Sequence, residues 1–310
     1  MAISSTDAIL RIFGLARDIF PGRTPRDLKN RVVVLRKAIT HLREVRLWYG
    51  ISDSPRLASA LQRFPQINGA IHWPYINNHW SMARRLQAVD QHYRLLEGRA
   101  AILARAVEAP VELASLDNHY PGLRMVVDKA IWFLREGEIV LNLFLRDQRV
   151  YSIAFTLGLE DNQLVAYVGA LQGSNVEEIR RTYSEMTRSL YGMRPRDLLV
   201  VALKILSGEL QVTRIFAVAD EARQHNSPYF GDSHKEKVLA DYDEVWAEHG
   251  GTRLGNGFFE IPVRVKYRDA ADIPTRKRAT YRRRYEMLDR LALEIRAACA
   301  PHDTGHAKER

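Results

Sequence analysis

The sequence predicts an α+β protein with a mixed, largely antiparallel sheet flanked by helices and an N-terminal helical subdomain. Three observations support this prediction. The first 105 residues contain no convincing strand, whereas several β-rich runs separated by short turns follow them. Between the β-rich runs, residues 163–210 have the pattern of a buried strand, a glycine turn and two helices.

Three β-rich runs, at 138–145, 150–159 and 164–171, are joined by short polar turns. Strands joined in this way pair in antiparallel order. The run at 164–171 contains no charged residue, so we expect a strand that is covered on both faces. Two later runs, at 214–219 and 257–265, predict strands that return to the sheet after the helices.

The spacing of apolar residues predicts helices across the first third of the chain. A helix over 27–49 carries an apolar stripe that we expect to be buried, formed by Leu28, Val32, Leu35, Ile39, Leu42 and Val45. The sequence therefore divides into a helical subdomain at residues 1–109, an α+β core at 110–272, a basic helix docked on the core at 273–298, and a polar tail at 299–310.

Composition limits the class of protein and its compartment. A chain of 310 residues with 46% hydrophobic and 27% charged residues can form an adequate core. Its single cysteine, Cys299, excludes an internal disulfide and favours a reducing compartment. No run approaches the ~18 apolar residues of a membrane span, and the N-terminus lacks the pattern of a signal peptide. We expect a cytoplasmic protein whose amphipathic N-terminus either docks on the body or lies on the inner membrane.

The net charge of +9 favours an anionic partner, such as a small molecule, a peptide or a lipid head group. Six of the nine residues at 276–284 are cationic. On a helix, Arg278 and Arg282 share one ridge with Arg283 beside it, and their guanidinium groups suit phosphate or carboxylate. A solvated helix face would give the same pattern. We do not expect nucleic acid as a partner, because aromatic residues are not interleaved on the exposed side.

The turn after the uncharged strand is the candidate binding segment. Gln172 ends the strand, where its amide could either satisfy backbone groups or point into a pocket. Gly173 and Ser174 precede a helix whose first N–H groups could hold a phosphate. Ser174 and Glu177 also have the spacing of a capping box.

Arg194 is the second candidate for binding an anion. Pro195 holds it in an extended conformation, and a cation at a helix start opposes the helix dipole. An anionic neighbour is therefore expected, either a ligand or a carboxylate of the protein such as Asp197.

Three residues are candidates for acid–base chemistry. His119 and His225 lie in polar loops beside predicted strands. Asp243 lies near a helix start, where a carboxylate can act as a general base, bind a divalent ion with its neighbours, or only stabilise the helix dipole. The sequence contains no histidine pair with metal-ligand spacing, no GxSxG elbow and no phosphate loop, so we expect no metal site.

The order of a strand meander, helices and returning strands is similar to that of GNAT-like acyltransferases. These enzymes hold the pyrophosphate of their cofactor at a helix N-terminus. The resemblance implies a coenzyme A thioester as cofactor, its phosphates on the turn around Gly173, and His225 or Asp243 as the base. The glycine-rich Q/RxxGxG/A loop of that class is absent.

Several segments together resemble the VirK/YbjX-like family, a domain-of-unknown-function family of Gram-negative bacteria. These segments are Arg135-Glu136-Gly137-Glu138, Gly169-Ala170-Leu171-Gln172-Gly173, Arg194-Pro195, Ala240-Asp241-Tyr242-Asp243 with Trp246, and Lys277-Arg278 leading to Tyr281-Arg282-Arg283-Arg284-Tyr285. The resemblance covers roughly residues 40–295 and implies a link to virulence and envelope stress, with no assigned reaction.

Two functions remain open on the sequence, and it does not decide whether the protein is an enzyme. An acyltransferase predicts a closed pocket where Gln172, Arg194 and the basic helix converge. A non-catalytic accessory protein of envelope stress or virulence predicts that the arginines of that helix spread over an open surface.

Overall fold

The α+β class is confirmed by the computed structural model, which describes residues 5–50, 54–97, 100–175, 179–230 and 241–300. One eight-stranded sheet has the strand order β1-β2-β3-β4-β5-β6-β8-β7. Its strands are β1 (Val111–Ser115), β2 (Leu123–Asp128), β3 (Ile139–Leu145), β4 (Gln148–Glu160), β5 (Gln163–Gly173), β6 (Arg214–Val218), β7 (Thr252–Arg253) and β8 (Phe258–Ile261).

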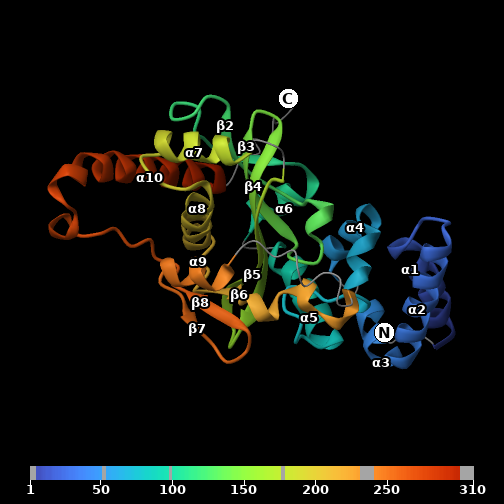
Figure 1. The fold of residues 1–310 in the computed structure, drawn as a ribbon. Coiled ribbons are helices and arrows are strands. Elements are labelled where there is room, and N and C mark those ends of the chain that lie inside the picture. The colour runs from blue at the N-terminus through green and yellow to red at the C-terminus, as the bar shows by residue number, and fades with distance from the viewer. Residues whose placement is uncertain (1–4, 51–53, 98–99, 176–178, 231–240, 301–310) are drawn as a thin grey trace, which may run out of the picture.

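Helices flank the sheet, with α1–α3 gathered at one end of the molecule and α10 at the other (Figure 1). Their bounds are α1 (Ser5–Ile19), α2 (Pro25–Thr40), α3 (Leu42–Gly50), α4 (Pro55–Arg63), α5 (Met82–Leu95), α6 (Ala101–Glu108), α7 (Ile179–Ser189), α8 (Pro195–Glu209), α9 (Tyr242–Glu248) and α10 (Arg278–Cys299). The expected antiparallel meander is present as β3, β4 and β5, and the sequence missed β1 and β7.

The prediction of one long helix at 27–49 is wrong in two respects. The helix is interrupted at His41, so that α2 and α3 are separate helices. The expected stripe is also not the buried face of α2: Val34 and Ala38 are buried instead. Leu28, Val32 and Ile39 are 53%, 56% and 60% exposed. The other half of the stripe does contact the core: Leu35 and Leu42 are partly buried and Val45 is buried.

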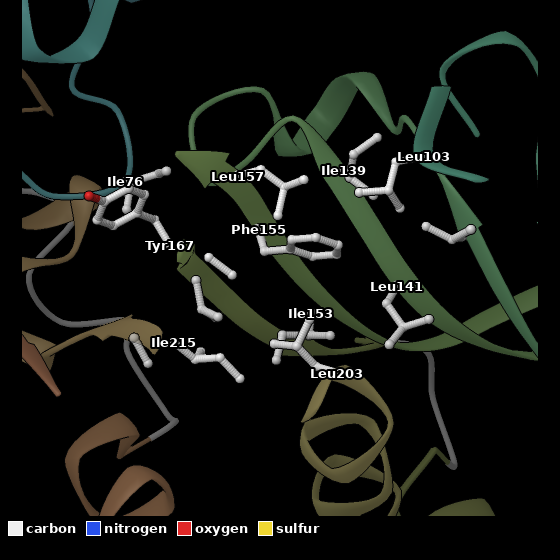
Figure 2. Close-up of a cluster of buried hydrophobic side chains, with 14 of the residues drawn as sticks. Ile76, Leu103, Ile139, Leu141, Ile153, Phe155, Leu157, Tyr167, Leu203 and Ile215 are labelled. Atoms are coloured by element: carbon white, nitrogen blue, oxygen red, sulfur yellow. The ribbon is translucent and has the colours of Figure 1, made fainter. Parts of the chain in front are cut away.

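One hydrophobic cluster joins the N-terminal helices to the sheet. Side chains of β3 and β4, such as Leu141, Ile153 and Phe155, point into it (Figure 2). Leu203 of α8 and Leu103 of α6 cover them from the helix layer. The predicted uncharged strand, β5, is buried over 164–171 as expected from its composition.

The sheet separates at the carboxyl end of β5. Parallel pairing with β6 covers residues 165–168, and Gly169 is then an extra residue opposite β4. Beyond Gly169, β5 continues to Gly173 paired only with β4. The N–H of Leu171 faces the resulting gap and donates to Tyr242 Oη at 2.7 Å. Tyr242 of α9 therefore occupies part of the gap between β5 and the end of β6.

A buried ion pair anchors the segment that connects β2 to β3. Lys129 Nζ lies 2.6 Å from Glu138 Oε2, and both side chains are 1% exposed. Tyr93 of α5 and Tyr75 donate to the same carboxylate at 2.8 and 3.1 Å. Burial alone would raise the pKa of Glu138, but Lys129 and these hydrogen bonds hold it below its ordinary value. The pair thus ties α5 and the residue 75 loop to the sheet.

Replacing Lys129 by methionine should destabilise the fold by about 3–5 kcal/mol, because it leaves a buried carboxylate without its cation. Urea denaturation followed by circular dichroism measures this loss. The double variant Lys129→Met/Glu138→Gln should recover most of it, since the amide is neutral. Arg181→Gln removes an exposed pair with Glu185 and should cost less than about 1 kcal/mol. A Lys129→Met loss no larger than this control would contradict the assigned role.

Candidate functional site

The candidate site is built around Glu136, where several of the sequence segments singled out above meet. The Glu136 carbonyl oxygen would lie 2.1 Å from a Cβ atom at Gly169, so a side chain at 169 would displace the segment from β5. The Glu136 side chain turns toward two amides. Gln224 Nε2 donates to its Oε1 at 3.0 Å, and Gln172 Nε2 reaches the same oxygen at 3.5 Å.

Glu136 is only 9% exposed. Burial raises its pKa to about 7, even though the Gln224 hydrogen bond and the charges of Arg135 and Arg223 act in the opposite direction. A carboxyl group with a pKa near neutrality can accept and return a proton at physiological pH. Such groups are common at functional sites.

Glu136 forms one wall of a pocket of about 350 Å³. Its lining consists of Gln66, Trp73, Ile131, Trp132, Leu134, Arg135, Glu136 and Gln224. The Arg135 guanidinium lies 5.0 Å from the ring centroids of both Trp73 and Phe230. Within the described residues, Trp73 Nε1 and Gln224 Oε1 are buried without a hydrogen-bond partner. Orphaned polar atoms of this kind often mark a bound water or ligand.

A second layer of residues holds the start of α9 beside this pocket. The Arg223 guanidinium lies 3.7 Å from the ring centroid of Tyr242 and 3.2 Å from Asp220 Oδ1. Asp220 Oδ2 accepts from the backbone N–H of Tyr242 at 2.7 Å. These contacts keep Tyr242 in the gap between the strands.

The three predicted acid–base residues lie in different surroundings. His225 directly follows Gln224 in a short 3-10 turn and is half-buried. Asp243 accepts a hydrogen bond from the N–H of Asp220 at 2.8 Å and forms an ion pair with Arg253. Its carboxylate thus links α9 to the segment after β6 and to β7. His119 packs edge-on against Tyr191 at 5.7 Å. Burial and the charge of Arg290 on α10 lower the pKa of His119. His119 does not line the Glu136 pocket.

The predicted phosphate turn is engaged by the protein itself. The N–H of Ser174 donates to Tyr183 Oη at 2.8 Å and approaches the carbonyl of Val150 at 3.0 Å. A Cβ atom at Gly173 would meet Tyr183 Oη at 2.6 Å, so the turn packs closely on α7. The capping-box partner, Glu177, lies outside the described residues.

In the part of the chain that the structure describes, Gln172 and Arg194 have different side-chain partners: Gln172 lies against Glu136, and Arg194 pairs with other carboxylates. Arg194 donates to Asp197 at 2.6 Å and to Glu248 at 2.5 Å, so its anionic neighbours are carboxylates of the protein. The three candidate arginines of α10 are exposed, whereas Arg284 donates to the Tyr191 carbonyl. Arg278 donates to a backbone carbonyl, Arg282 lies 3.9 Å from Glu286 on the same helix, and Arg283 is exposed.

The sequence analysis did not select Glu136 as a candidate site residue. Its only signal was membership in the run Arg135-Glu136-Gly137-Glu138, where two acids precede an apolar strand. Neither Trp73 nor Gln224 carried a recognisable pattern. Among the described residues, no group of three His, Cys, Asp or Glu side chains could hold a metal ion. In the same ranges no helix is both long and apolar enough to span a bilayer.

Comparison with known proteins places these features in a family. The chain is 29% identical to the uncharacterized protein YbjX of Escherichia coli, over 77% of this chain and 74% of that protein. It is 27% identical to an uncharacterized protein of Haemophilus influenzae, over 95% and 98%. A weaker match, 23% identical, links 52% of the chain to 69% of the membrane protein LapB of Mannheimia haemolytica.

The family match spans nearly the whole fold and includes every residue of the Glu136 pocket. Residues 23–297 match the family described as "Protein of unknown function (DUF535)". The similarity to YbjX confirms the resemblance that the sequence segments indicated. The chain therefore belongs to the DUF535 family, which is the VirK/YbjX family.

Proposed function

We propose that this chain is a group-transfer enzyme with a GNAT-like core, in which Glu136 accepts a proton from the substrate. The observation that carries the proposal is a buried carboxyl group with a pKa of about 7 on the wall of a pocket. The backbone of Glu136 packs against Gly169, the point where β5 and β6 separate. The antiparallel meander of β3, β4 and β5, followed by the parallel strand β6, supports the proposal of a GNAT-like core.

In an acyl transfer, Glu136 would take the proton from an amine or hydroxyl group of the acceptor. The acceptor atom then bonds to the carbonyl carbon of a thioester, the C–S bond breaks, and the thiol leaves with a proton. Trp73 lines the pocket, and its buried Nε1, which has no hydrogen-bond partner among the described residues, is the donor we propose for the oxygen that gains charge in the transition state. Glu136 replaces His225 and Asp243 as the proposed base, since Asp243 is engaged by Arg253.

Acyl-coenzyme A should stabilise the purified chain against heat. A ligand that binds the folded state raises the melting temperature in proportion to the logarithm of its concentration above Kd. Differential scanning fluorimetry with acetyl-coenzyme A and longer acyl-coenzyme A thioesters measures this rise, with nucleotides and divalent metals as comparisons. The absence of a shift with every acyl-coenzyme A would contradict an acyl-transfer function.

Glu136→Gln should change how stability depends on pH. The pKa of Glu136 is raised in the folded state, so the unfolded chain releases the proton first, and wild-type stability falls as pH rises from about 5 to about 8. The variant cannot ionise and lacks this fall, which is on the order of 3 kcal/mol for a shift of this size. Urea denaturation across this pH range measures the difference between the two proteins.

Glu185→Gln is the matched control for this experiment. Hydrogen bonds from Arg181 and Tyr120 lower the pKa of Glu185, so its contribution is already complete above the ordinary value for glutamate. This variant's stability should run parallel to the wild type over the same pH range. Parallel curves for Glu136→Gln as well would show that Glu136 is not a buried acid of raised pKa.

A second candidate function is an accessory role at an anionic lipid surface. The specific observation is the exposed apolar stripe of α2, formed by Leu28, Val32 and Ile39. Residues 21–50 contain eight Lys or Arg and two Asp or Glu. An apolar stripe flanked by cations is typical of a helix that lies on a charged membrane. The name of the LapB relative, a membrane protein, is consistent with such a location.

Sedimentation with vesicles tests this second candidate. Vesicles that contain phosphatidylglycerol should bind the chain, whereas vesicles of phosphatidylcholine alone should not, because the cations of α2 need an anionic surface. Leu28→Ser/Ile39→Ser should abolish sedimentation, since it removes the inserted stripe. The control Arg282→Gln/Arg283→Gln lowers the charge on α10 and should still sediment. Equal sedimentation of both variants would contradict the role of α2.

A further inference from the structure

A second cavity, of about 740 Å³, shares no lining residue with the Glu136 pocket. Its walls are α8, the end of α9 and the strap, which we define as residues 262–272. In Figure 1 the strap is the extended orange segment that leads from β8 toward α10. The cavity therefore lies between the core and the strap.

The wall contributed by α8 presents a buried cation. Lys204 is 5% exposed and lines the cavity. Its Nζ donates to the His249 carbonyl at 2.9 Å, which caps the carboxyl end of α9. An ammonium group has three N–H donors, and the described residues supply this one acceptor. The remaining donors are available to an anion in the cavity.

The strap contributes three further cations in a regular pattern. Arg264, Lys266 and Arg268 alternate with Val265 and Tyr267. All three cations line the cavity, and the Arg268 guanidinium also lies 5.9 Å from the ring centroid of Tyr281. Arg264 and Lys266 are exposed.

The strap is held in place by α10. The Tyr267 ring stacks on Tyr285 with a centroid separation of 4.3 Å and an interplanar angle of 3°. Tyr267 Oη donates to Asp289 at 2.7 Å, and the N–H of Arg268 donates to Tyr285 Oη at 2.9 Å. The cations of the strap are thus presented from a fixed backbone, which lowers the entropy cost of binding.

The acidic residues of the lining do not cancel these cations. Glu248 is engaged by Arg194 at 2.5 Å and Arg196 at 3.1 Å. Asp269 accepts from the N–H of Ala271 and caps a short turn, which leaves Asp272 as the remaining acid. The lining therefore carries four cations and three acids, and of these acids Glu248 already pairs with two arginines outside the lining.

We propose that this cavity binds the phosphoryl group of a small phosphorylated molecule, with Lys204 beneath the group and the strap cations around it. Phosphate accepts several hydrogen bonds at once and is matched by clustered Lys and Arg side chains. The site lies beyond the proposed chemistry of Glu136 and does not require it. Its phosphoryl group could belong to free pyrophosphate or to a phosphorylated coenzyme.

Isothermal titration with inorganic pyrophosphate tests the site at constant ionic strength. The wild type should bind pyrophosphate. Arg264→Gln/Lys266→Gln should raise the Kd at least about tenfold, which corresponds to a loss of about 1.4 kcal/mol of binding free energy. Both residues are exposed, so the fold should be unaffected. The control Arg282→Gln/Arg283→Gln removes two exposed cations from α10 and should bind as the wild type does. Glu136→Gln should also bind normally, which separates this site from the proposed active site.

A second arm identifies the source of the phosphoryl group. Dephospho-coenzyme A lacks the ribose 3′-phosphate of coenzyme A. Titration with both compounds under the same conditions therefore shows whether this 3′-phosphate is the group that is bound. Tighter binding of coenzyme A than of pyrophosphate, lost in Arg264→Gln/Lys266→Gln, would assign the site to a phosphorylated coenzyme. Absence of pyrophosphate binding, or equal weakening in the strap variant and the α10 control, would overturn the proposal.

Discussion

The buried ion pair between Lys129 and Glu138 is the constraint on which the rest of the candidate site depends. Two charges with almost no solvent contact are stable only when each is paired and hydrogen-bonded. Tyr75 and Tyr93 complete the set, so the connection from β2 to β3 can take one path. That connection carries Glu136 two residues before Glu138, and its position follows from the anchored pair.

The anchored pair also determines the surroundings of the Glu136 carboxyl group. The absence of a side chain at Gly169 lets the anchored segment pack against β5, which buries the Glu136 carboxyl group and raises its pKa. The pKa values of these two acids are therefore shifted in opposite directions. Glu138 has a cation at 2.6 Å, whereas Glu136 has amides as hydrogen-bond partners. Burial with a cation gives a structural charge, and burial with amides gives an exchangeable proton.

The sequence predicted the sheet better than it predicted the site. Strands such as β5 were recognisable because an uncharged run between turns has few other uses. The buried face of α2 was not, since Val34 and Ala38 compete with the longer stripe and only tertiary contacts decide between them. Gln172 was selected as a candidate because it ends a strand at a glycine turn. Glu136 was missed because its burial depends on residues more than 30 positions away, which spacing cannot reveal.

The most direct test of this account is a measurement of the Glu136 carboxyl group itself. Chain labelled with ¹³C at the glutamate side-chain carboxyl can be titrated by NMR, with Glu136→Gln used to assign the resonance. The account predicts one resonance that titrates near pH 7, as the pKa of Glu136 requires, and that is missing from the variant. If the Glu136 resonance titrates at the ordinary value for glutamate, the carboxyl group is not held as a neutral acid, and the proposed proton transfer would be contradicted.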